Sequence, residues 1–97
     1  MKAHELINTR EKWTTGTLAR DKEEQKVEYD SPQAVCWCMW GAICKLYPFI
    51  KKNGEYNYER AQINKKIELA TQGLSPGNWN DSSTYEQVFN LLKKLDI

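Results

Sequence analysis

The sequence predicts an α+β fold, in which a β-hairpin packs with three or four helices around one central, very apolar helix. Threonine- and valine-containing segments on either side of a charged stretch predict the hairpin. The apolar run from Ala34 to Cys44 predicts a buried helix, and two later segments have apolar residues at helical spacing. With 97 residues, the size of one domain, we expect a single domain over residues 1–97.

The composition is that of an ordinary folded protein, because 40% of the residues are hydrophobic and 28% are charged. The formal net charge is only +1. A chain so nearly neutral lacks the broad positive field with which proteins gather nucleic acid or acidic membranes. We therefore expect neither nucleic acid nor a membrane as partner.

The chain has three cysteines, Cys36, Cys38 and Cys44, which are close together in the sequence. A secreted disulfide scaffold has an even number that is spread along the sequence, so we expect free thiols and a cytoplasmic location. All three cysteines lie in the apolar run, so we expect all three thiols to be buried. The residues at the N-terminus include no signal-peptide core. The longest apolar run would rise only about 16 Å as a helix, against the roughly 30 Å of a bilayer core.

The first elements are a helix and the hairpin. Residues Ala3 to Lys12 predict a short amphipathic helix with a narrow apolar stripe. Thr14 to Leu18 and Val27 to Tyr29 favour extended backbone, and the stretch from Asp21 to Lys26 forms the charged hairpin tip.

The central helix is predicted over Pro32 to Tyr47, because Asp30 and Ser31 can cap it and proline suits the first helical position. Its interior is apolar all round, which indicates cover on most sides. Gly41 costs about 1 kcal/mol relative to alanine within a helix, so we expect another element to cross closely there.

Two more helices are predicted. The first shows the apolar spacing of a helix and ends at Gly73, with its stripe formed by Ile63, Ile67, Ala70 and Leu74. The last begins at a reciprocal capping box of Ser83 and Glu86. Its apolar face consists of Tyr85, Val88, Phe89, Leu92 and Leu95.

Cys38 is the one candidate nucleophile, since a thiolate near a helix N-terminus has a lowered pKa. Apolar neighbours instead favour a buried, inert thiol, and the only histidine, His4, is distant in sequence. Cys36 and Cys38 diverge by about 200° on a helix, so they cannot share a metal ion. We expect no metal site and no cofactor.

The four tryptophans are a high load for this length. Trp37 and Trp40 lie three apart and are expected to bury on one side of the central helix. Trp13 and Trp79 lie in connections, where each ring either covers the core or faces a partner.

Two polar pairs are candidate binding residues: Arg20 with Asp21 at the hairpin shoulder, and Asn80 with Asp81 in a turn before the last helix. Structural roles explain them as well. Asp21 can start the hairpin turn, and Asp81, or one of the two serines after it, can cap the last helix.

Three strings stand in a definite order: Trp13 to Asp21 with its Ala-Arg-Asp, Ala34 to Ala42 with its Trp-Cys-Met-Trp-Gly-Ala, and Trp79-Asn80-Asp81. With them the chain resembles a family of small uncharacterised bacterial and phage proteins, known only as a domain of unknown function. The resemblance runs from Trp13 to about Leu95. The family tends to have glycine at the hairpin tip, where this chain has Lys22 to Gln25.

The resemblance implies no activity, but it implies that the polar strings belong together. We therefore expect the hairpin shoulder to meet the turn before the last helix, with Arg20 paired to Asp81 and Trp79 packed beside them. A guanidinium offers the planar fork that suits a carboxylate.

The function predicted is that of a small non-enzymatic binding protein, encoded by a phage or mobile element and acting on a host protein or a small anionic ligand. The candidate binding residues are Trp13, Arg20, Asp21, Trp79, Asn80 and Asp81. The alternative is a small hydrolase or transferase that uses Cys38 or Asp81.

Overall fold

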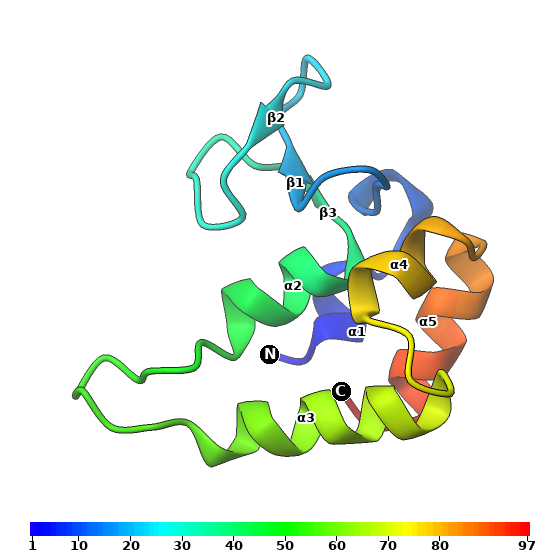
Figure 1. Cartoon of the computed structure of the whole chain (residues 1–97). Helices are drawn as coiled ribbons and strands as arrows, with labels where there is room; N and C mark the ends of the chain where they lie inside the picture. Colours follow the sequence, from blue (N-terminus) through cyan, green and yellow to red (C-terminus); the bar gives the residue numbers. More distant parts are fainter.

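A small antiparallel sheet and five α-helices make up the fold in the computed structural model, which describes residues Met1 to Ile97 (Figure 1). The elements in chain order are α1 (Ala3–Leu6), the 3-10 helix η1 (Arg10–Lys12), β1 (Ala19–Arg20), β2 (Lys26–Val27), β3 (Cys36–Trp37), α2 (Met39–Leu46), α3 (Tyr58–Ala70), α4 (Pro76–Asp81) and α5 (Tyr85–Lys94). The α+β class is therefore confirmed. None of these helices has the length and apolar character needed to cross a bilayer.

The sheet has the strand order β2-β1-β3, with both pairings antiparallel. Ala19 in β1 lies opposite Val27 on one side and Trp37 on the other. β1 and β2 form the expected hairpin, whose charged tip closes through a 2.9 Å bond from Asp21 N–H to the Gln25 carbonyl. The strands are shorter than expected, and the third strand, β3, was not predicted.

The prediction of one long central helix from Pro32 to Tyr47 was wrong, because α2 begins only at Met39. Pro32 lies in a turn, in which the Ser31 carbonyl accepts from Ala34 N–H at 3.1 Å. Residues 36 and 37 then pair with β1, which satisfies their backbone groups in the sheet. Cys38 is extended and caps α2, its Sγ accepting from Gly41 N–H at 3.2 Å.

The core nevertheless forms around α2, whose Met39, Ala42 and Ile43 are fully buried. α2 contacts α1, α4 and β3, while α1 also contacts α5. The remaining buried apolar side chains come from segments throughout the chain: Ala3, Ile7, Ala19, Trp37, Tyr47, Ile63, Ile67, Val88, Leu92 and Ile97. The apolar segment was thus correctly placed at the centre, although only its second half is helical.

The first predicted helix is broken in two. α1 ends at Leu6, and Ile7 already has non-helical backbone angles. The Ile7 carbonyl accepts from the Tyr85 hydroxyl at 2.8 Å, and Thr9 is extended before η1. A contact from α5 thus ends a pattern that continues in the sequence.

The two later helices are confirmed with shifted details. In α3 the buried residues are Ile63 and Ile67 together with Arg60, whereas Ala70 is exposed and Leu74 lies beyond the helix end. In α5 the capping box consists of Thr84 and Gln87, one residue later than expected. Its buried residues, Val88 and Leu92, are on the predicted face.

Arg60 ties α3 to the C-terminal end of α2 and was not predicted. Its side chain is 1% exposed, and Nη1 donates to the carbonyl of Tyr47 at 2.6 Å. The guanidinium carbon lies 4.4 Å from the centre of the Trp40 ring and 4.2 Å from that of Phe49. Carbonyls at a helix C-terminus and aromatic faces both attract a cation, so the charge is held here without a carboxylate.

Gly41 is the place where another segment crosses α2 closely, as predicted. A Cβ atom on Gly41 would lie 2.0 Å from the carbonyl oxygen of Leu18. That carbonyl accepts from Cys38 N–H at 3.2 Å, so it cannot move away without breaking the link between the residues before β1 and the start of α2. The contact is therefore between two backbones.

We predict that Gly41→Ala destabilises the fold even though alanine favours a helix by about 1 kcal/mol. Overpacking of a well-packed contact typically costs about 1 to 3 kcal/mol or more, and the rigid carbonyl places Gly41 at the upper end. Urea unfolding measures the change. Gly77→Ala in α4 is the matched control, because nothing lies within 4 Å of its Cβ position. Equal stabilities of the two variants would contradict the crossing.

Candidate functional site

Asn80 joins three segments that are far apart in the sequence. Its side chain is fully buried, and Oδ1 accepts from Trp13 Nε1 at 2.7 Å and from the backbone N–H of Met39 at 3.0 Å. Nδ2 donates to the carbonyl of Thr14 at 3.2 Å and to Oδ1 of Asp81 at 3.2 Å. The amide therefore connects the segment after η1, the start of α2 and the end of α4.

Asp81 extends this connection, since its Oδ1 also accepts from Gly16 N–H at 3.1 Å. The start of the first string, Trp13 to Gly16, thus contacts Asn80 and Asp81. The shoulder residues that we expected there, Arg20 and Asp21, make no hydrogen bond to them. The expected pairing of Arg20 with Asp81 was wrong, because the only ion pair in the chain joins Lys2 and Asp96. Asp81 also does not cap the last helix, which Thr84 does, and the string ends α4 instead of forming a turn.

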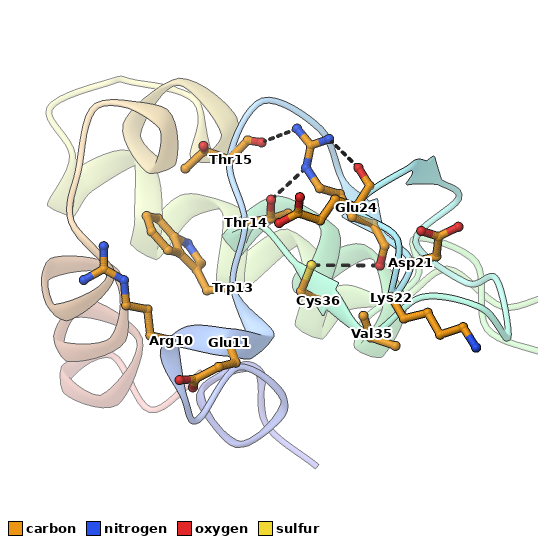
Figure 2. A pocket seen from close by; sticks show the side chains of 11 residues that line it. Arg10, Glu11, Trp13, Thr14, Thr15, Asp21, Lys22, Glu24, Val35 and Cys36 are labelled. Atoms are coloured by element: carbon orange, nitrogen blue, oxygen red, sulfur yellow. Dashed lines mark hydrogen bonds between the residues drawn. The ribbon is translucent and has the colours of Figure 1, made fainter.

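Arg20 instead braces the hairpin from within. Nε donates to Thr14 Oγ1 at 3.0 Å, and the two terminal nitrogens donate to the carbonyls of Glu24 and Thr15, each at 3.1 Å. Dashed lines in Figure 2 mark these bonds. The guanidinium thus holds the segment before β1 against the hairpin tip.

A groove with a volume of about 660 Å³ opens beside this brace. We call it the hairpin groove, and its lining residues are Arg10, Glu11, Trp13, Thr14, Thr15, Arg20, Asp21, Lys22, Glu24, Val35 and Cys36. Figure 2 shows Arg10 and Trp13 on one side and Lys22 and Val35 on the other. The lining is mostly polar and holds three cationic and three acidic side chains, Arg10, Arg20, Lys22, Glu11, Asp21 and Glu24.

Trp13, Arg20 and Asp21, in the walls of the hairpin groove, are held in place by hydrogen bonds within the protein. The Trp13 indole is fixed by its hydrogen bond to Asn80, and its ring lies 5.9 Å from that of Tyr85. Asp21 Oδ1 accepts from the backbone N–H groups of Glu23 and Gln25, both at 2.9 Å. The expectation that Asp21 starts the hairpin turn is therefore confirmed, and this carboxylate is already engaged.

Sequence reasoning thus named two kinds of residue as one site. Trp13, Arg20 and Asp21 line the groove, whereas Asn80 and Asp81 stand behind it as supports and Trp79 packs against the core. Arg10, Lys22 and Val35 were missed as groove residues. Exposed side chains of this kind carry no sequence pattern that separates them from other surface positions.

Cys38 is 4% exposed, and burial raises the pKa of its thiol. It lines a second hollow of about 340 Å³ together with Asp81, whose negative charge also raises that pKa. His4 lies on α1, with its ring 6.3 Å from that of Phe89. The surroundings of Cys38 therefore favour the neutral thiol, which is the unreactive form.

All three cysteines are free, but Cys36 and Cys44 are only partly buried, so the expectation of three buried thiols was wrong for two of them. Cys36 lies in the groove, where burial raises the pKa of its thiol. No three histidine, cysteine, aspartate or glutamate side chains converge in an arrangement that could hold a metal ion.

This geometry defines a small α+β protein with a polar groove at its hairpin. By sequence, residues 1–95 match a family described as a family of unknown function, DUF6197, and the chain belongs to that family. No curated protein and no solved structure matches the chain. The match agrees with the expected resemblance to a family without known activity and extends it to residue 1, while the bacterial or phage origin stays a prediction.

We predict that Asn80→Ala lowers the free energy of unfolding by about 2 kcal/mol or more, since three polar groups lose their bond to Asn80 and an unsatisfied buried group typically costs about 1 to 3 kcal/mol. These are Trp13 Nε1, Met39 N–H and the Thr14 carbonyl. Asn90→Ala on the exposed face of α5 should change it by less than about 0.5 kcal/mol. Similar urea midpoints for both variants would contradict the role of Asn80.

We predict that Cys38 reacts more slowly with iodoacetamide than Cys36 or Cys44 in the folded protein, because it is the most buried of the three. Each thiol is followed in a variant whose other two cysteines are serine. The three rates should converge in urea. Fastest labelling at Cys38 in the folded protein would reverse this order and revive the nucleophile hypothesis.

Proposed function

We propose that this protein is a non-enzymatic binding protein whose hairpin groove holds a segment of a partner protein. The hairpin groove itself carries the proposal: it is large enough for several side chains, and its volume lies within the range of about 300 to 1,000 Å³ that ligand sites occupy. The groove is also the largest hollow on the chain.

Rigidity of the walls supports binding. Trp13 is held by Asn80, Arg20 by three hydrogen bonds, and the hairpin tip by Asp21. A site whose groups are fixed before the partner arrives loses little conformational entropy on binding. The entropy cost of ordering these groups is therefore incurred when the chain folds. The hydrogen bonds of the buried Asn80 side chain offset this cost.

The balanced charge of the lining favours a protein segment over a free polyanion. Three carboxylates, those of Glu11, Asp21 and Glu24, would repel a multiply charged phosphate. A peptide offers charges of both signs together with apolar groups. Val35, which is 47% exposed, and the ring of Trp13 supply apolar surface for it.

The alternative function, a hydrolase or transferase based on Cys38 or Asp81, has less support. The Cys38 thiol makes no hydrogen bond to a base, and Oδ1 of Asp81 already accepts two hydrogen bonds within the protein. Cys38→Ser separates the two functions, since serine is a good helix cap and a binding protein should keep its partner, while a thiol enzyme should lose turnover. An agent of phage or mobile-element origin acting on a host protein is the specific form that we propose.

We predict that the double reversal Arg10→Glu with Lys22→Glu weakens binding to the groove about tenfold or more, because both side chains line it and neither makes a hydrogen bond within the protein. The probes are peptides selected with the wild-type protein from a displayed library of random short sequences. Folding stability should stay within about 0.5 kcal/mol, as for other surface changes.

Lys65→Glu with Lys66→Glu is the matched control, because both lysines are exposed on α3 and outside the hairpin groove. This variant should bind the selected peptides like wild type. Equal loss in both double variants would indicate a general charge effect and would contradict the groove. A library that yields no binding peptides would contradict the proposal as a whole.

A further inference from the structure

We infer that the partner segment is anchored in the hairpin groove by a carboxylate, which Arg20 binds through the N–H groups that the fold leaves free. This inference rests on the proposed function and adds the chemistry of the ligand. The carboxylate belongs to an aspartate or glutamate side chain of the partner, and an apolar residue next to it contacts Trp13 and Val35.

Arg20 has hydrogen-bond donors that the fold does not use. Each terminal nitrogen of a guanidinium has two N–H groups, and each donates only one bond here, to Glu24 and to Thr15. One N–H on each terminal nitrogen is therefore unused. Two parallel N–H groups match the two oxygens of a carboxylate, and such charge-assisted pairs are among the strong hydrogen bonds of proteins.

No carboxylate of the protein itself pairs with Arg20. Its three acceptors are a hydroxyl and two carbonyls, all of them uncharged. Asp21 follows it directly in the chain, yet its Oδ1 is turned to backbone N–H groups at the hairpin tip. The cationic charge of Arg20 is thus fixed in place and lines a groove without being neutralised by an ion pair.

The other charged side chains of the groove determine whether a substitution should strengthen or weaken carboxylate binding. Lys22 and Arg10 should attract an incoming carboxylate, while the carboxylates of Glu11 and Glu24 should oppose it. Glu24 accepts the hydrogen bond from Arg20 through its backbone carbonyl, so its side chain can be neutralised without removing that bond. Glu24→Gln and Lys22→Gln therefore change the charge on either side of Arg20 and leave its frame intact.

The experiment uses synthetic versions of groove-binding peptides from the library, each with an amidated C-terminus, and measures affinity by calorimetry. Replacing the acidic side chain by its amide should weaken binding about tenfold or more. A peptide that binds only with a free C-terminus would place the carboxylate at the chain end and overturn the side-chain assignment.

The protein variants give opposite signs if the inference is correct. Glu24→Gln should strengthen binding of the acidic peptide about two- to fivefold, and Lys22→Gln should weaken it by a similar factor, as expected for partly exposed charges. Lys65→Gln is the control and should leave the affinity unchanged. A peptide affinity that changes with neither Lys22→Gln nor Glu24→Gln would overturn the inference.

The failure of this inference differs from failure of the proposed function. Groove-binding peptides that lack an acidic residue, yet lose affinity on the Arg10 and Lys22 double reversal, would refute the carboxylate anchor and leave the binding function standing. A library without any binding peptide would refute both. Loss of binding in Arg20→Lys with unchanged stability would further support a two-point contact between the guanidinium and the carboxylate. Lysine keeps the positive charge but lacks the planar pair of N–H groups.

Discussion

The buried amide of Asn80 is the interaction on which the arrangement of the other elements depends. An isolated polar side chain in a core is costly, but this one is bonded through both its oxygen and its nitrogen. Its partners come from the segment before β1, from α2 and from α4. Shifting any one of these segments would leave a buried polar group unpaired, and no buried side-chain polar atom is unpaired in the fold.

Two further constraints act on the same helix, α2. At its start, the carbonyl of Leu18 lies so close to Gly41 that only a residue without a Cβ fits. At its end, Arg60 is held between Trp40 and Phe49 and donates to the last carbonyls. A short helix with little stability of its own is thus fixed at both ends by contacts from distant parts of the chain.

The hairpin groove follows from these constraints. Trp13 reaches its position because Asn80 holds its indole nitrogen, and the sheet places Arg20 and Cys36 opposite each other in neighbouring strands. The supporting residues and the lining residues therefore form separate layers. Asn80 and Asp81 were therefore predicted as binding residues although they support the groove from behind and do not reach it.

The sequence by itself determined the α+β class, the charged hairpin tip and the two later helices, because these depend on local propensity and on periodic apolar residues. The unfavourable glycine within a helix predicted a close crossing at position 41, but only the tertiary structure decided that the Leu18 carbonyl makes it. Only the tertiary structure decided that residues 36 and 37 form a strand, since an apolar run suits either a buried helix or a buried strand. Pairing with β1 settles that choice. The partners of Arg20, Asn80 and Arg60 were likewise decided in three dimensions, because hydrogen bonds between distant residues leave no periodic trace in one chain.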